Sequence, residues 1–181
     1  MGPNKLELME AIRRRRTVRR YKADPVPEDK INHVLEAARL APSYYNEQSW
    51  KFIVITQEQI KEKVLRCISA LSRLTFNPVP PVLIVGCADP KKSAIKGDQE
   101  YYLVEMGIAM EHLMLAATEL GLGTAWMCAF DENTVKQILG VPEDVRVVAL
   151  TPLGYPAEEK EEVRERKPLK EIVCKECWIA G

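Results

Sequence analysis

An unbroken apolar run, VLIVGCA, occupies residues 82–88 and decides the class of fold. A strand with one face in water alternates apolar and polar side chains, whereas a strand covered on both faces is apolar throughout. The proline-rich break 77–81 precedes the run and Asp89 follows it, so its length suits a strand. We therefore expect a buried strand with helices above and below its sheet.

The segments on either side of this run supply the other layers. Further strands are expected over residues 51–56, 124–130 and 145–153. Helices are expected where apolar residues recur at helical spacing, over residues 6–16, 26–41, 57–71, 99–120, 131–139 and 169–173. This order predicts a three-layer α/β (α+β) fold with a mixed sheet, in a single domain that spans residues 1–181.

The expected helix over residues 99–120 is apolar nearly all round and contains the small residues Gly107, Ala109, Ala116 and Ala117. Such a helix needs to be buried on most of its sides. A core of this size has limited room to enclose it, so a second subunit is the expected cover. The sequence thus predicts a homodimer.

The composition is that of an ordinary globular protein, with 181 residues and 26 basic side chains balanced by 26 acidic ones. Because the net charge is zero, no overall electrostatic field attracts nucleic acid or an anionic membrane, and neither is expected as a partner. No run approaches the roughly 18 apolar residues of a membrane span, and the N-terminus has no apolar signal core. Five scattered cysteines argue against a secreted disulfide framework, and we expect a cytoplasmic protein.

A dense arginine cluster lies at residues 13–20, and a second basic group lies at residues 164–167. Guanidinium groups beside a hydroxyl, here Thr17, suit a phosphate monoester because each arginine fork binds two oxygens. A solvated helix face would explain the same charges. A nucleic-acid patch is less well supported, since aromatic residues are not interleaved with the arginines.

A polar loop over residues 43–49 separates an expected helix from an expected strand. The amides of Asn46 and Gln48 both donate and accept, which suits a heterocycle that carries carbonyls and ring nitrogens. A plain helix-to-strand connection explains the polarity equally well. The stretch GLG at residues 121–123 follows a helix and is no dinucleotide fingerprint, which requires a preceding strand and a third glycine. Gly121 is instead expected to end that helix.

The remaining polar residues form no recognisable catalytic set. Cys174 and Cys177 have metal-like spacing but lack two further ligands in a pairing pattern, and His33 and His112 are expected to be ordinary helix residues. No nucleophile elbow or phosphate-binding P-loop occurs. If the protein is an enzyme, a cofactor is therefore expected to supply the reactivity.

Several stretches taken together resemble the nitroreductase family. They are RRTVRRY at residues 15–21, AARLAPS at residues 37–43 with Asn46, Gln48 and Trp50, the region 107–130, and LGYP at residues 153–156 followed by RKPL at residues 166–169. The likeness spans nearly the whole chain in order. It implies a central, mainly antiparallel mixed sheet flanked by helices, in an interlocked homodimer that binds FMN at the subunit interface.

The resemblance also implies roles for particular residues. The FMN phosphate and ribityl chain would be held by Arg15, Arg16, Thr17 and Arg166, with Arg164 a further candidate. Arg19 would approach the pyrimidine edge of the flavin, where its positive charge would stabilise the negative charge gained on reduction. The partner subunit would supply Pro42, Ser43, Asn46 and Gln48, and the flavin's N5 side would face Trp126, Met127, Cys128 and Ala129.

The implied activity is a ping-pong transfer of electrons from NADH or NADPH to a flat acceptor such as a nitroaromatic or a quinone. Ser49 and Cys128 depart from the family's usual residues, proline at the first position and glycine or glutamate at the second. A flavin-binding electron carrier or sensor, and the flavin-cleaving and dehalogenating branches of the same fold, are alternatives. A basic interaction module built on residues 13–20 would bind polyanions and no flavin.

Overall fold

The computed structural model describes residues 7–68, 76, 79–158 and 165–178. Within these ranges the helices are α1 (Leu8–Arg14), α2 (Glu28–Arg39), α3 (Glu58–Arg66), α5 (Tyr101–Glu119), α6 (Glu132–Leu139) and α7 (Leu169–Ile172), with short 3-10 turns at η1 (Tyr44–Asn46) and η2 (Pro90–Lys92). The strands are β1 (Trp50–Ile55), β2 (Val82–Ala88), β3 (Ile95–Lys96), β4 (Gln99–Glu100), β5 (Gly123–Thr124) and β6 (Arg146–Gly154).

Strand β2 lies inside a four-stranded sheet of order β1-β2-β6-β5, in which neighbouring strands run antiparallel. Every residue of β2 is buried. Val82 and Ile84 pack in the core formed with α2 and α5, whereas Leu83 and Val85 pack in the core formed with α3 and α6. The prediction of a strand covered on both faces is confirmed. The ladders of the sheet are antiparallel, and a single parallel bridge joins Thr17, which is in no named strand, to Thr124 of β5.

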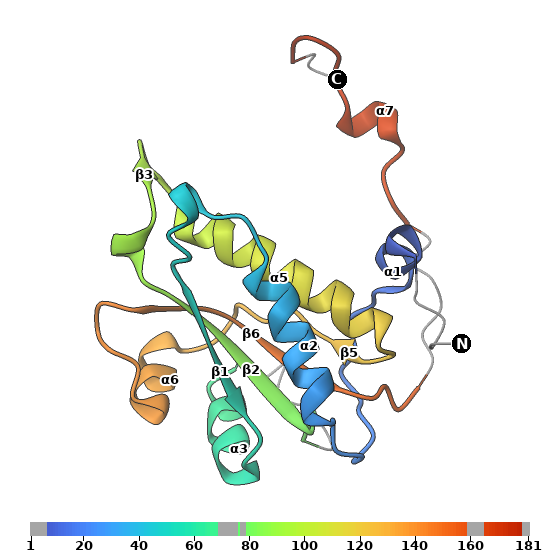
Figure 1. The fold of residues 1–181 in the computed structure, drawn as a ribbon, viewed down its shortest axis with the longest axis vertical. Coiled ribbons are helices and arrows are strands. Elements are labelled where there is room, and N and C mark those ends of the chain that lie inside the picture. The colour runs from blue at the N-terminus through green and yellow to red at the C-terminus, as the bar shows by residue number, and fades with distance from the viewer. Residues whose placement is uncertain (1–6, 69–75, 77–78, 159–164, 179–181) are drawn as a thin grey trace.

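The helices form a layer on each side of this sheet, as Figure 1 shows for α2 and α5 on one side and α3 and α6 on the other. Helix α5 passes close over β2 at Gly86, where a Cβ atom would lie 2.6 Å from Met106 Sδ. The predicted three-layer arrangement of helices and sheet is therefore confirmed. None of the described helices combines the length and apolarity needed to cross a bilayer.

Two predicted elements differ from the structure. The helix expected over residues 6–16 ends at Arg14, because Arg15 has left the helical conformation (φ −53°, ψ 128°) and Val18 N donates to Thr124 O at 2.8 Å. The strand expected over residues 124–130 is cut short after β5. Beyond it, Met127 forms an isolated bridge with Leu150 and Phe130 forms one with Ile68, so the chain crosses from one partner to another instead of following one strand.

The segment 165–178, which contains α7, extends away from the body of the molecule past α1 (Figure 1). All of its described side chains are exposed, including the apolar Leu169, Ile172, Val173 and Trp178. The short helix expected over residues 169–173 is confirmed as α7, although it packs on nothing within the described part of the chain.

Candidate functional site

The arginine-rich segment after α1 runs as extended backbone beside β5. Val18 is buried, and its side chain lies so close to Gly123 that a Cβ there would be 2.6 Å from Val18 Cγ2. Behind the segment, the hydroxyl of the buried Tyr21 donates to Val18 O. Burial raises the pKa of that hydroxyl, so it stays protonated and keeps the hydrogen bond. The segment is therefore held rigidly against the sheet.

Side chains of this segment line two different cavities. Arg16 and Val18 line a cavity of about 610 Å³. Arg19 lines a smaller cavity of about 120 Å³. Arg15 and Thr17 are not in the lining of either cavity. Arg15 lies near Glu111 of α5, and Thr17 forms a bridge with Thr124.

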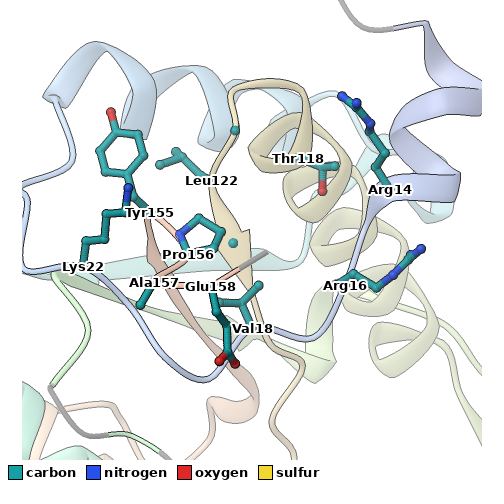
Figure 2. Close-up of a pocket in the computed structure, with 12 residues that line it drawn as sticks. Arg14, Arg16, Val18, Lys22, Thr118, Leu122, Tyr155, Pro156, Ala157 and Glu158 are labelled. Atoms are coloured by element: carbon teal, nitrogen blue, oxygen red, sulfur yellow. The ribbon is translucent and has the colours of Figure 1, made fainter. Parts of the chain in front are cut away.

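The larger cavity is cationic at its rim (Figure 2). Arg14 and Arg16 lie on one side and Lys22 on the other, with Glu158 between them in the view. Thr118, Tyr155 and the backbone of the glycine-containing turn at residues 121–123 complete much of its wall. Of the site residues predicted from sequence, the lining includes Arg16, whereas Arg14, Lys22 and Tyr155 were not singled out.

The smaller cavity brings together more of the predicted residues. Arg19 shares it with Trp126, Met127, Cys128 and Ala129. Trp126, Cys128 and Ala129 are exposed and Met127 is buried. Met127 therefore belongs to the buried part of the wall, and the other three residues belong to its solvent-exposed part. A cation thus lies beside an accessible stretch of backbone and a large aromatic ring.

The polar loop lies elsewhere in the chain. Ser43, Asn46 and Gln48 are on a turn at the β3–β4 end of α5, whereas α1 and the arginine segment lie toward the opposite end (Figure 1). Pro42, Asn46 and Gln48 are exposed, and Ser43 is half-buried. The structure of a single chain therefore does not bring this loop to the arginines.

The other predicted phosphate ligands are spread along the chain. Arg15 Nε lies 3.9 Å from Glu111 Oε1 on α5, at the long end of an ion-pair distance. Arg166 is in the exposed segment 165–178, where its Nη1 donates to Glu165 O at 2.9 Å. Arg164 lies outside the described residues.

Comparison with known proteins identifies the fold family. The family model described as "Nitroreductase family" matches residues 12–80 and 71–155. The chain belongs to the nitroreductase family. A relative named NADH dehydrogenase, from Thermus thermophilus, is 31% identical, and the match covers 93% of this chain and 95% of that protein.

Solved structures agree with this nitroreductase assignment. The crystal structure of a nitroreductase family protein from Clostridium novyi is 37% identical, with a TM-score of 0.78 over 86% of this chain and 89% of that one. An FMN-dependent nitroreductase from Clostridium difficile is 25% identical, with a TM-score of 0.83 over 94% and 99% of the two chains. Another relative is an iodotyrosine deiodinase from Thermotoga neapolitana, which is 26% identical; the match covers 84% of this chain and 90% of that protein.

The other reactive side chains of this nitroreductase-family chain form no second catalytic centre in the described ranges. His112 Nδ1 lies 3.3 Å from Ala37 O, and His33 Nε2 lies 3.6 Å from Glu119 Oε2, so both histidines serve contacts between α2 and α5. Burial raises the pKa of the Cys87 thiol to about 11, which makes it a poor nucleophile. No group of three or more metal-binding side chains occurs among the described residues.

One polar residue of the core was missed from sequence. Glu105 on α5 is buried and accepts three hydrogen bonds, two of them from the polar loop. In the sequence, Glu105 is noticeable as a carboxylate among the apolar residues of α5 that are buried. The residues that bond to it are far away in sequence, so this position alone indicated no role for Glu105.

Proposed function

We propose that the chain is an FMN-dependent oxidoreductase that takes electrons from NADH or NADPH and passes them, in a ping-pong cycle, to a flat acceptor such as a nitroaromatic or a quinone. The observation that carries this proposal is the cavity in which Arg19 lies beside residues 126–129. FMN, when bound, supplies the redox chemistry, and the protein supplies position and charge.

The residues of the arginine segment fit a ligand with a phosphate at one end and a ring at the other. Arg15 and Arg19 are four residues apart, a separation that spans about 13 Å in a nearly extended chain. Arg15 and Thr17 would hold the phosphate through charge-assisted and hydroxyl hydrogen bonds, together with Arg166. Arg16 lines the larger cavity and not the one that Arg19 lines, so it is the weaker candidate for the same phosphate.

Arg19 would act through its charge. An arginine beside the pyrimidine edge of a flavin stabilises the reduced form more than the oxidised form, because negative charge develops there on reduction. The exposed backbone and ring of residues 126–129 would form the opposite wall, with Trp126 packing nearby. Cys128 would lie at the open side, where it would shape access of the donor and the acceptor.

A homodimer would complete this site. The loop that carries Pro42, Ser43, Asn46 and Gln48 cannot meet the arginine segment of its own chain, since α5 separates them (Figure 1). A second subunit that packs along α5 would bring its own loop to the cavity. Each FMN would then contact both chains, with the amides of Asn46 and Gln48 bonding to the ring system.

Replacing Arg19 tests the proposal. In Arg19→Ala, the two-electron midpoint potential of bound flavin should fall, by roughly 20 mV for each 1 kcal/mol of lost stabilisation of the reduced form. Arg20→Ala is the matched control. That arginine lies next in sequence, but its exposed side chain is turned toward Glu158, with Nη1 3.6 Å from Oε2. Equal potentials in both variants and the unmodified protein would remove the proposed role of Arg19.

A second candidate function is reductive dehalogenation, which the similarity to an iodotyrosine deiodinase favours. The two activities differ in their acceptor and share the flavin site. Iodide released from iodotyrosine under reducing conditions, with slow turnover of quinones and nitroaromatics, would support the dehalogenating branch. A protein that binds flavin but turns over none of these acceptors would instead be an electron carrier or a sensor.

A further inference from the structure

We propose that Glu105 is a positioning residue that holds the loop at residues 43–49 in the shape required for flavin contact. The inference rests on the proposed function for its consequence, since the loop is assigned to the flavin of the partner subunit. Its physical basis lies within one chain. Glu105 is on α5, and its carboxylate accepts hydrogen bonds from the loop.

The carboxylate of Glu105 is buried, with 5% of the residue exposed, and neutral donors surround it. Its Oε1 accepts from Tyr44 N at 2.9 Å and from Ser93 Oγ at 3.0 Å. Its Oε2 accepts from Ser49 Oγ at 2.7 Å. Among the described residues no cation forms an ion pair with it, so these donors alone offset the loss of water around a buried charge.

The three donors connect different parts of the fold. Tyr44 lies at the start of the loop, Ser49 at its end directly before β1, and Ser93 directly after η2. Ser49 is itself 4% exposed, and its carbonyl accepts from Asp89 N at 2.9 Å. A single carboxylate therefore fastens both ends of the loop to the central helix and to the connection that follows β2.

The loop between these two ends needs such support. Tyr45, Asn46 and Gln48 adopt φ angles of 44°, 62° and 50°. These angles lie in the left-handed region, which residues other than glycine rarely adopt. Strained residues of this kind persist where surrounding contacts hold them, and they gather at functional sites. Tyr45 is 83% exposed, and its ring packs edge-on against Tyr44 of the same loop, with centroids 4.5 Å apart, a contact that does not attach the tip to the body of the molecule.

Bonds inside the loop complete its shape. Ser43 Oγ accepts from Gln48 N at 3.0 Å, and Asn46 O accepts from Gln48 Nε2 at 3.0 Å. These bonds close the turn on itself but do not attach it to the body of the molecule. The attachment comes from Glu105, and its loss should free the turn to leave the left-handed conformation that presents Asn46 and Gln48 outward.

The test uses the full-length protein and two independent readouts. In Glu105→Ala, hydrogen exchange of the amides at residues 44–49 should speed up at least tenfold, which measures the attachment directly. The dissociation constant of FMN should rise at least tenfold, and the visible flavin spectrum should shift, since hydrogen bonds to the ring system are lost. Glu119→Ala is the control, because it removes a carboxylate from the far end of the same helix.

A milder variant guards against misfolding of Glu105→Ala. Ser49→Ala removes one of the three donors and leaves the carboxylate bonded to Tyr44 N and Ser93, so the fold should survive. It should reproduce both effects in smaller measure, and adding it to Glu105→Ala should have little further effect. Unchanged exchange of residues 44–49 in Ser49→Ala and in Glu105→Ala would overturn the inference.

The two readouts separate this inference from the proposed function. Faster exchange of the loop with an unchanged dissociation constant and spectrum would show an attachment without a role in flavin binding, and would overturn the positioning role. Failure of the unmodified protein to bind FMN at all would overturn the proposed function, and the positioning role with it. Loss of FMN affinity that only follows a fall in the folded fraction, with normal affinity in the remaining folded protein, would indicate a structural residue only.

Discussion

Position 123 shows how a single hydrogen atom in place of a side chain shapes the candidate site. Gly123 lies on β5, and its φ angle is one that other residues also adopt. Glycine is needed there because a side chain would not fit. All three side-chain carbons of Val18 would lie within 2.9 Å of an added Cβ. The arginine segment can approach the sheet only because that Cβ is missing.

Gly123→Ala should therefore destabilise the protein by about 1 to 3 kcal/mol, the usual cost of an added methyl group in a packed core. Urea unfolding measures this free energy. Val18→Ala is the partner variant, because it removes the atoms that the new methyl group would meet. The cost of Gly123→Ala should be smaller in the Val18→Ala background, and an equal cost in both backgrounds would rule out this contact as the cause.

At the scale of the elements, charged hydrogen bonds join α6 to β6. Glu132 Oε1 accepts from Arg146 Nε at 2.9 Å and from Val147 N at 2.9 Å, and Glu132 Oε2 accepts from Arg146 Nη2 at 3.0 Å. Arg146 Nη1 also donates to Tyr102 OH on α5, at 2.9 Å. These bonds, chiefly those from Arg146, hold the pKa of Glu132 below its usual value.

A carboxyl whose pKa is lowered by folding stabilises the folded state above its unfolded pKa, and this stabilisation is lost as the pH falls through the folded value. Glu132→Gln should therefore be less stable than the unmodified protein at pH 7, by about 1 kcal/mol once the partial exposure of the pair is allowed for. The difference should shrink toward zero below about pH 4. Urea midpoints of both proteins between pH 7 and pH 3 check this, and a constant difference would contradict it.

Elements with a local pattern could be predicted from sequence. The apolar run of β2 and the length of α5 both follow from side chains that are neighbours along the chain, and the fold class followed from them. The first helix was expected to continue to Arg16 but ends at Arg14. The pairing of Thr17 and Val18 with Thr124 could not be read locally, because it joins residues more than a hundred positions apart. The hydrogen-bond partners of Glu105 could not be predicted from sequence either, because Tyr44 and Ser49 come close to it only in the folded chain.

The site residues divide in the same way. The likeness of residues 15–21 and 126–130 to the family was readable in sequence, and the structure places Arg19 beside Trp126–Ala129. Arg16 and Arg19 line different cavities, and this separation could not be predicted because the helix was expected to continue through Arg16. The cavity lined by Arg14, Lys22 and Tyr155 arises between segments from both ends of the chain, and no local pattern indicates it.

The whole molecule has an uncovered apolar face along α5. Val104 is 54% exposed and Leu103 is 43% exposed, and Ile108, one turn after Val104, is partly buried. A second copy of the chain would bury this face, as the proposed homodimer requires.

Val104→Glu should weaken the homodimer at least tenfold, about 1.4 kcal/mol, because a charge would have to be buried in the interface. The FMN content should fall with it, since each flavin would be held by both chains. Gln137→Glu on α6 adds the same charge on the other side of the sheet and should change neither quantity. Sedimentation velocity with the flavin absorbance recorded checks both, and an unchanged dimer in Val104→Glu would place the interface elsewhere.

The central claim concerns the cofactor and its reduction, and one spectroscopic titration tests it most directly. The purified protein is reconstituted with FMN, freed of excess flavin, and mixed anaerobically with NADH and then, in a separate sample, with NADPH. We predict a bound flavin spectrum that bleaches promptly with at least one of the two donors and returns when a quinone is added. A protein that retains no FMN after reconstitution, but binds a polyanion in a salt-sensitive way, would contradict the account and indicate an interaction module built on residues 13–20.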